Sequence, residues 1–271
     1  MKKTLYLLPL LLILCFSACE IIDPDDILTP ITADTTTYND QRIILLEEYT
    51  GNMCPNCPDA AVEVEKLMKM YPNRIVVIAI HSGAFARPIP PRGYTADFRT
   101  TVGDSLTNHY GVSAYPNGII NRALTNGTYL HGYGEWESII GGLVADTTPA
   151  NASITINVTP NADDSSYNVI VNTVTKQYGS LKLCVYVTED NLVCQQAYGQ
   201  ETIPDYNHGH VLRCSLNNTW GETIGNESNK AYNLSVAGTG WNPDNLNIVA
   251  FIYDETNGTV IQTKQVRCPA L

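Results

Sequence analysis

Two cysteines, Cys54 and Cys57, have the spacing that dithiol chemistry requires. They follow an apolar run at residues 43–46 and a short segment that contains Gly51. A buried strand that breaks at this glycine and continues as a helix places the first sulfur beside unpaired N–H groups at the positive end of the helix dipole, which favour a thiolate. The second sulfur, one turn further on, is close enough to resolve a mixed disulfide. Pro58 suits the first helical turn, where its missing N–H costs little.

The segments around this pair indicate an α/β arrangement. Residues 59–71 have the apolar spacing of an amphipathic helix, and residues 74–81 form a nearly continuous apolar run, typical of a strand covered on both faces. Strand, helix and strand predict a right-handed parallel crossover. The Pro- and Gly-containing loop 82–95 then starts on the same sheet edge as Cys54, where we expect it to wall a substrate groove.

The next segments continue the α/β pattern and end in a resemblance. We expect a helix at 96–110, a short strand at 117–122 directly after Pro116, a hairpin partner at 128–131 and a closing helix at 135–145. The order β-α-β-α-β-β-α, with Cys-x-x-Cys after the first strand and a proline before the third, resembles the thioredoxin fold. By this resemblance Glu48 matches the buried acid beneath the dithiol, and Tyr115-Pro116 matches the cis-proline element that faces it. Met53 departs from the pattern, because it replaces the tryptophan that usually precedes the first cysteine.

The resemblance implies a role for each residue of the candidate site. Cys54 would be the exposed nucleophile and Cys57 the buried resolving thiol. Glu48 would shuttle protons, because burial raises the pKa of a carboxyl toward neutrality. Pro116 would hold the substrate strand against the sulfurs and keep metal away. Four neighbours would form the substrate groove: Tyr115, Met53, Pro55 and Asn56. The alternative is a stabilising disulfide in a binding domain that has the fold without the chemistry.

From residue 148 the composition changes to strands and turns. Seven candidate strands lie at 153–158, 167–174, 181–188, 210–216, 233–236, 247–253 and 259–266. Short strands of this kind, separated by Gly and Asn turns, suggest an immunoglobulin-like β-sandwich. The predicted fold class is therefore α/β plus all-β, with a thioredoxin-like domain at 39–147 and the sandwich at 148–271.

The sandwich carries four further cysteines. In an exported chain an even number of cysteines points to disulfides, and four cysteines allow three connectivities. We favour one disulfide across the 192–213 excursion and a second near the last strand, pairing Cys194 with Cys214 and Cys184 with Cys268.

The N-terminus predicts export. Lys2 and Lys3 precede an apolar stretch at 5–16, which is too short for a comfortable membrane span and is typical of a signal peptide covering residues 1–18. The residues before Cys19 resemble a bacterial lipobox, which implies a lipid on Cys19; a plain secretory signal is the alternative. Residues 19–38 are polar and acidic and predict a flexible tether. Acidic residues directly after the lipidated cysteine resemble surface-export signals of Bacteroidetes lipoproteins.

Charge and composition exclude several functions. The net charge of −11 argues against nucleic-acid binding, which needs a basic face. No cofactor is predicted, because zinc would need ligands beyond the single Cys-x-x-Cys of the first domain. His208 and His210 could share one face of a strand and bind metal, but no acidic or cysteine ligand is obviously placed beside them, so we expect a surface strand end.

Taken together, these features resemble one family. The lipobox, the thioredoxin-like segment, the sandwich and the stretches 208–213 and 219–222 are similar to the outer-membrane-protein-28-related lipoproteins of Bacteroidetes. This implies an outer membrane lipoprotein, anchored through Cys19 and possessing a surface-exposed face. The expected partners are the thiols of exported proteins, for a thiol–disulfide oxidoreductase. The alternative partner is a surface ligand, for an adhesin-type lipoprotein in which Cys54 and Cys57 form a structural disulfide.

Overall fold

The computed structural model describes residues 41–162, 165–176 and 179–271, so the predicted signal peptide, the tether and Cys19 lie outside the described residues. The first half of the described chain contains, in order, β1 (Ile44–Thr50), α1 (Cys57–Met70), β2 (Ile75–His81), two short 3-10 helices (Ala84–Ala86 and Pro90–Arg92), α2 (Thr101–Tyr110), β3 (Asn117–Ile120) and α3 (Tyr133–Ala145). The second half contains β4 (Ala152–Pro160), β5 (Ser166–Thr175), β6 (Leu181–Glu189), β7 (Leu192–Tyr198), β8 (Glu201–His208), β9 (Val211–Ser215), β10 (Glu222–Ile224), β11 (Glu227–Ser235), a 3-10 helix (Pro243–Asn245), β12 (Leu246–Asp254) and β13 (Val260–Arg267).

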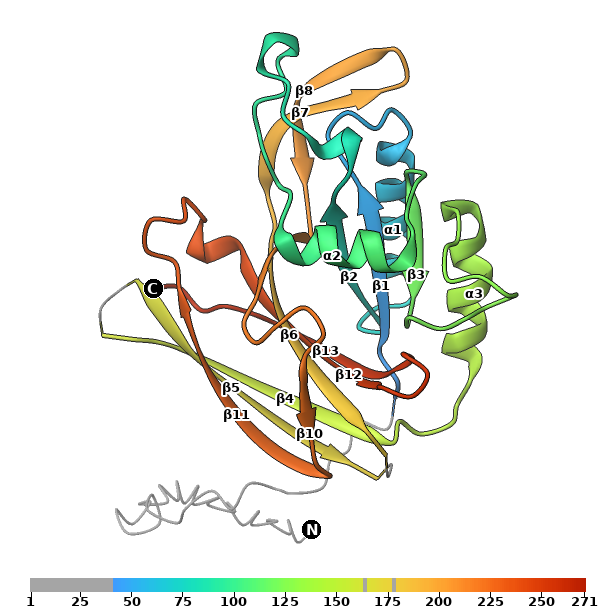
Figure 1. The fold of residues 1–271 in the computed structure, drawn as a ribbon, viewed down its shortest axis with the longest axis vertical. Coiled ribbons are helices and arrows are strands. Elements are labelled where there is room, and N and C mark those ends of the chain that lie inside the picture. The colour runs from blue at the N-terminus through green and yellow to red at the C-terminus, as the bar shows by residue number, and fades with distance from the viewer. Residues whose placement is uncertain (1–40, 163–164, 177–178) are drawn as a thin grey trace, which may run out of the picture. The chain divides into compact units, whose positions relative to one another are not determined.

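One large mixed sheet takes strands from both halves of the chain, in the order β13-β12-β6-β9-β2-β1-β3, with β10 added to β6 (Figure 1). β1 and β2 are parallel and joined through α1, as the apolar pattern predicts, and β3 is antiparallel to β1. The two halves meet where β9 pairs with β2 at Ala79 and Val211. The predicted domain boundary at 147/148 falls between α3 and β4 and stays a prediction, because the sheet itself continues across both halves.

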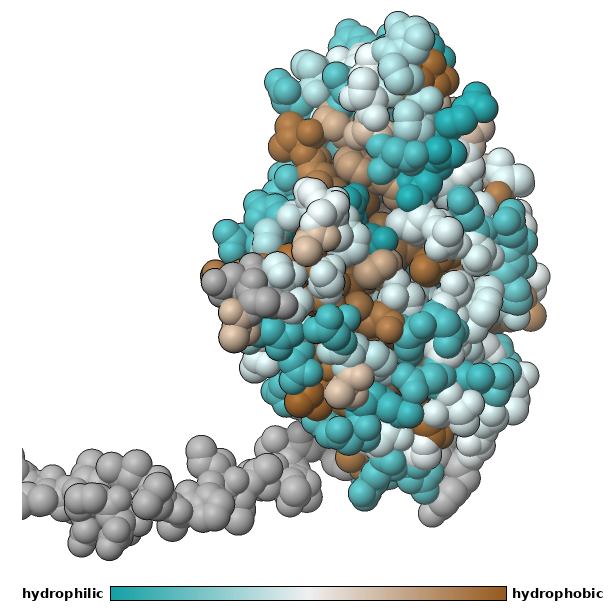
Figure 2. Space-filling view, turned by 60° about the vertical axis from the view of Figure 1, so that its left-hand side comes forward, coloured by the Kyte–Doolittle hydropathy of each residue, from teal (hydrophilic) through white to brown (hydrophobic). Residues whose placement is uncertain are grey.

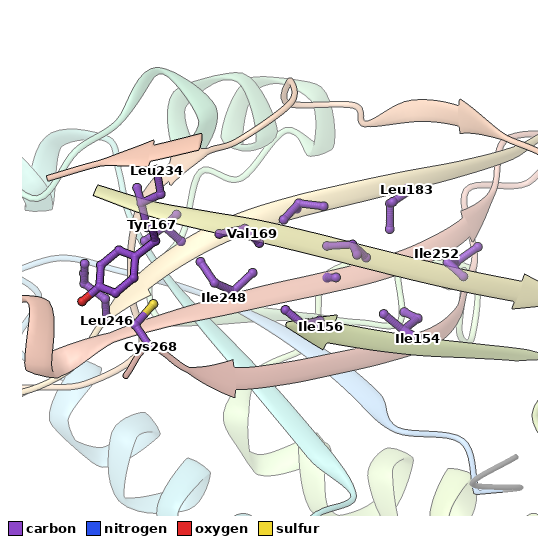
Figure 3. Packing of buried hydrophobic residues seen from close by; sticks show 14 of the residues in the cluster. Ile154, Ile156, Tyr167, Val169, Leu183, Leu234, Leu246, Ile248, Ile252 and Cys268 are labelled. Carbon is purple, nitrogen blue, oxygen red and sulfur yellow. The ribbon is translucent and has the colours of Figure 1, made fainter. Parts of the chain in front are cut away.

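Both faces of this sheet are covered. Side chains that alternate along β1 pack on one face against α1 and α3 and on the other against α2. The α2 face continues onto β6 and β12, where Tyr186 and Phe251 extend the same core. On the opposite face of β6 and β12, a three-stranded sheet, β11-β5-β4, encloses a second core that includes Leu183, Ile248 and Tyr167 (Figure 3).

A buried ion pair within the first half contacts the second half through the ring of Phe251. Arg122, which follows β3, donates from Nε to Oε2 of Glu47 on β1 at 2.9 Å and from a terminal nitrogen to Oε1 at 2.5 Å. Neither side chain is more than 1% exposed. The guanidinium lies 4.7 Å from the ring centre of Phe251 on β12. A desolvated charge pair with this bidentate geometry is costly to break from one side.

The sequence patterns missed some strands. β7 and β8 form a separate two-stranded hairpin within the segment that was expected to be an irregular excursion, and their register shifts between Cys194 and Gln196. Pro204 in β8 has no N–H to donate to a ladder, which weakens the strand pattern. The expected hairpin partner at 128–131 reduces to one bridge between Gly118 and His131.

The surface is mixed in character. Figure 2 shows one face, on which hydrophobic residues occur in small areas among hydrophilic ones. The most exposed large apolar side chains, Val62, Val193 and Leu124, come from separate parts of the chain. Among the described residues, no helix has both the length and the apolar composition needed to cross a membrane.

Candidate redox site

Cys54 and Cys57 form a disulfide at the junction of β1 and α1, with their Cα atoms 5.4 Å apart. Cys57 is the first residue of α1, and Pro58 follows in the first turn, as the spacing predicts. Gly51 makes the turn after β1, where a Cβ atom would lie 2.6 Å from the carbonyl carbon of Phe85. Its missing side chain lets the 84–86 segment approach, so that the main-chain N–H of Met53 donates to the oxygen of Phe85 at 2.9 Å.

The β7–β8 hairpin covers this disulfide. The main-chain N–H groups of Ala197 and Gly199 donate to the oxygens of Asn52 and Pro55 at 2.8 and 3.0 Å. The buried side chain of Gln196 donates to the oxygen of Cys54 at 2.8 Å. Cys54 is consequently 0% exposed, and the expectation of an exposed nucleophile is wrong for this conformation. The reason is a segment distant in sequence, which no feature of the Cys-x-x-Cys stretch predicts.

Glu48 lies behind the disulfide, where the resemblance places a buried acid. Its side chain is 5% exposed, and burial raises its pKa from 4.5 to about 7. Glu48 and Cys57 line one cavity together with His81 on β2 and His208 at the end of β8. A carboxyl with a pKa near neutrality can both give and take a proton at physiological pH. The shuttle role of Glu48 stays a prediction.

The two histidines of the 208–210 stretch are not at an exposed strand end, because the ring of His208 packs against that of His81 on β2 and the main-chain oxygen of His210 accepts a hydrogen bond from the N–H of Ala79. His208 is 5% exposed and His210 is three-quarters buried. Burial lowers the pKa of His208 to about 4, and it also lowers the pKa of His210. Within the described residues, no group of three or more His, Cys, Asp or Glu side chains is arranged to hold a metal ion.

The predicted groove residues divide between several places. Met53 and Pro55 line an open groove together with Phe85, Tyr94 and the tip of the hairpin. The water-accessible volume of this groove is about 430 Å³. Asn56 is exposed just before α1.

Tyr115 lies on the far side of Phe85, whose ring centre is 5.9 Å from its own, and its hydroxyl is 3.1 Å from Ser82 Oγ. The Tyr115–Pro116 peptide bond is cis, as the resemblance implies. Phe85 thus links Tyr115 to the loop that carries the disulfide. The role of Pro116 in holding a substrate strand stays a prediction.

The four remaining described cysteines are free thiols, so neither predicted disulfide is formed. Cys184 packs in the core that faces α2, whereas Cys268 packs in the core between the two sheets. The large sheet therefore separates these two sulfurs. Cys194 lies on the hairpin, 3.4 Å from Asn52 Nδ2, whereas Cys214 on β9 packs against the core between the sheets. Cys194 and Cys214 thus pack against different parts of the molecule, the disulfide loop and the core between the sheets, and their sulfurs are not bonded.

Several residues of the site were not anticipated from the sequence. Gln196, Ala197 and Gly199 hold the hairpin over the disulfide, and His81 joins His208 beside Glu48. The sequence does contain one indication of the hairpin itself. Gly199 lies in a two-residue connection between two short strands, which is a common hairpin pattern. Nothing in that pattern indicates where the hairpin packs.

Comparisons with known proteins give a family and a fold. The sequence profile of the family described as "Outer membrane protein Omp28" matches residues 103–269, a range that includes Pro116 and the hairpin and begins after Cys57. No curated protein matches the sequence.

Among solved structures, HBP35 of Porphyromonas gingivalis is 16% identical, with a TM-score of 0.68 over 84% of this chain and 76% of its own. Protein AGR_C_4864 from Agrobacterium tumefaciens is 12% identical, with a TM-score of 0.53 over 85% of this chain and 97% of its own. A domain of the outer membrane lipoprotein Omp28 from P. gingivalis is 24% identical and covers 44% of this chain and 88% of its own, with a TM-score of 0.34. The first two similarities show a shared fold.

Proposed function

The chain belongs to the Omp28 family of outer membrane proteins, and from this premise we propose that its Cys54–Cys57 pair performs thiol–disulfide exchange on exported proteins. The family membership confirms the predicted location at the outer membrane. The observation that carries the proposal is the disulfide at the start of α1 with the buried carboxyl of Glu48 behind it.

The arrangement of elements supports this proposal. The β1-α1-β2 crossover, the antiparallel β3 that follows a cis-proline, and α3 correspond in order to the thioredoxin fold that the sequence resembles. The packing of the β11-β5-β4 sheet against β6 and β12 of the large sheet supports an immunoglobulin-like sandwich in the second half. In this proposal the sandwich acts as a spacer or docking module.

The hairpin must move for a protein substrate to react. A substrate thiolate has to approach Cys54 Sγ along the axis of the disulfide, and Cys54 is fully buried while the hairpin is closed. The hairpin pairs only with itself as a two-stranded sheet, and such a unit is marginally stable by its own contacts. Its hydrogen bonds to Asn52, Pro55 and Cys54, with those of Tyr198 to Asp59 and between Thr202 and Tyr94, therefore oppose the opening that makes the disulfide accessible.

A second function is favoured by the burial of Cys54. If the hairpin remains closed, the disulfide stabilises the turn after β1, and the protein is a surface-binding lipoprotein of the adhesin type. Binding of its ligand would then survive the simultaneous substitution of Cys54→Ala and Cys57→Ala.

The reduction potential separates the two functions. The full-length protein in detergent is equilibrated with glutathione buffers, and the peptide that contains Cys54 and Cys57 is followed by mass spectrometry, so that the four free thiols do not contribute to the signal. A potential between roughly −270 and −120 mV, the range of exchange catalysts, is expected for an oxidoreductase. A potential below about −300 mV, the range of structural disulfides, would refute the exchange function.

A further inference from the structure

A polar cavity lies behind the disulfide, between α1, β1, β2 and the base of the β7–β8 hairpin. It offers about 90 Å³ to the centre of a water molecule, which is room for several waters. Cys57, Glu48, His81 and His208 contribute to its wall. Cys57 is thus the cysteine that reaches the cavity, and its sulfur is the leaving group in the proposed exchange reaction.

The cavity wall contains polar atoms that need partners. Both ring nitrogens of His81 and Nε2 of His208 are buried without a hydrogen-bond partner in the described part of the chain. The two residues are 3% and 5% exposed, and their ring centres are 5.4 Å apart. Buried polar groups are almost always hydrogen-bonded to protein or to ordered water. A cavity of this size with several convergent polar atoms meets the requirements for bound water.

The two imidazoles in the cavity wall are uncharged at neutral pH, which suits proton transfer. Burial lowers the pKa of His208 to about 4 and that of His81 well below its ordinary value, so both imidazoles are neutral at pH 7. A neutral imidazole presents one N–H donor and one nitrogen acceptor and can therefore extend a hydrogen-bonded chain in both directions.

Four other titratable groups of the described residues line the same space: Glu48 on β1, Glu65 on α1, Tyr206 on β8 and His210 in the β8–β9 turn. Two charged groups outside the cavity wall act on its histidines: Asp190, 3.5 Å from His210, and Arg213 on β9, whose charge lowers the pKa of His81.

We propose that this cavity holds a chain of water molecules, positioned by His81 and His208, that carries protons between solvent and the Cys57–Glu48 pair. This inference rests on the proposed exchange function and extends it to the route of the proton. The hairpin base supplies His208, and the hairpin body covers Cys54. A protein substrate seated over Cys54 would likewise exclude solvent from that side, which leaves the cavity as the path.

The reaction balances as follows for a substrate dithiol. A substrate thiolate attacks Cys54 Sγ, a bond forms between these sulfurs, and the Cys54–Cys57 bond breaks with its electron pair on Cys57 Sγ. Glu48 protonates that sulfur, and the water chain replaces the proton on Glu48 from solvent. The second substrate thiolate then attacks the substrate sulfur of the mixed disulfide and releases the Cys54 thiolate, which takes up a proton. The substrate is oxidised to a disulfide, and the protein is reduced to a dithiol; the reverse direction uses the same path.

Chemical rescue tests the role of His208. The rate of reduction of Cys54–Cys57 by dithiothreitol is measured in the full-length protein between pH 6 and pH 9, with and without added imidazole. We expect His208→Ala to slow reduction about tenfold at pH 7. This effect is smaller than the usual effect of removing an acid–base group, because water remains in the cavity. Added imidazole should restore most of the rate. His109→Ala removes an exposed histidine on α2 and serves as the matched control.

A second variant separates proton transfer from hairpin opening. His208→Phe keeps an aromatic ring against Tyr206, whose ring centre lies 4.8 Å from that of His208, but it removes both nitrogens. We expect this variant to be as slow as His208→Ala and insensitive to imidazole, because the ring fills the space that imidazole would enter. A loosened hairpin would instead speed reduction regardless of imidazole. Wild-type rates in His208→Phe, or a His208→Ala rate that imidazole does not change, would overturn the proposal.

The two proposals fail separately. A reduction potential in the range of structural disulfides would remove the exchange function, while the imidazole dependence of reduction by excess dithiothreitol would still report the proton route. An exchange-type potential without any imidazole dependence would retain the function and remove the route.

Discussion

The hydrogen bonds of Gln196 offer the sharpest test of the hairpin as a gate. Its side-chain nitrogen donates to the oxygens of Cys54 at 2.8 Å and Ala197 at 2.9 Å, and the side chain is 2% exposed. In Gln196→Ala the two carbonyl oxygens lose their donor. Leaving a buried polar group unsatisfied costs about 1–3 kcal/mol. Of these two bonds, the one to Cys54 joins the hairpin to the disulfide loop, as does a longer bond from the same nitrogen to the oxygen of Gly51 at 3.4 Å, so this cost falls mainly on the closed state.

The expected magnitude follows from that cost. A loss of about 1–3 kcal/mol from the closed state raises the open population roughly 5- to 150-fold. Gln196 also lines the polar cavity, where water can satisfy part of the freed carbonyl. We therefore expect the lower part of this range, about tenfold.

The assay measures how fast a small protein dithiol reduces the disulfide. The rate of reduction of Cys54–Cys57 by a small protein dithiol follows the open population when the hairpin opens and closes faster than the reaction. Gln195→Ala makes the same chemical change one residue earlier on the hairpin, at a position that lines neither the groove nor the cavity, and should leave the rate unchanged. An equal rate for the wild type and Gln196→Ala, at unchanged global stability, would show that the hairpin does not limit access.

Three further predictions concern stability. Glu48→Gln should remove a pH dependence: the raised pKa of Glu48 gives stability that is full below pH 4.5 and lost as the pH rises through about 7, so the variant should be about 3 kcal/mol more stable at pH 8. Arg122→Met should cost about 3–5 kcal/mol in urea unfolding, because it leaves the Glu47 carboxylate buried without a partner. Gly118→Ala should cost about 1–3 kcal/mol, since its Cβ would lie 2.6 Å from a buried indole ring, whereas Gly142→Ala, in open space on α3, should be neutral or stabilising.

Each stability prediction has a contrary result. If the difference in the free energy of unfolding between Glu48→Gln and the wild type is the same from pH 4 to pH 8, the pKa of the Glu48 carboxyl is not raised by folding. If Glu47→Leu with Arg122→Met is no more stable than Arg122→Met alone, the cost does not come from an unpaired charge. Equal effects of the two glycine substitutions would mean that the indole ring moves aside.

The first half of the fold could be predicted because its signals are local. A continuous apolar run at 74–81 predicted β2 (Ile75–His81), and the Cys-x-x-Cys-Pro stretch predicted the start of α1. Helix α2 begins at Thr101 rather than residue 96, because Thr100 caps it by accepting a hydrogen bond from the N–H of Gly103. A capping threonine is a better guide to that boundary than the apolar spacing.

The features that the sequence did not predict depend on packing between distant segments. The hairpin's contacts with Asn52 and Pro55 join residues about 140 positions apart, and no periodicity encodes such a contact. The cysteine pairing failed for the same reason, because Cys184 and Cys268 occupy opposite faces of a sheet whose strand order was not known. Arg122 was assigned to the end of a strand, and its charge gave no sign that Glu47 would be buried against it.

The direction of β1 determines which end of the molecule a substrate meets. The described chain enters the fold beside Ile44, and the disulfide follows Thr50, so the seven residues of β1 separate the two by about 20 Å. A lipid on Cys19 would hold the protein from the entry end of this strand. The attachment to the chain and the disulfide would then lie at opposite ends of β1, and the predicted flexible tether would add to the distance between the disulfide and the lipid. Large folded partners would therefore have more room at the disulfide than at the end of β1 where the chain enters.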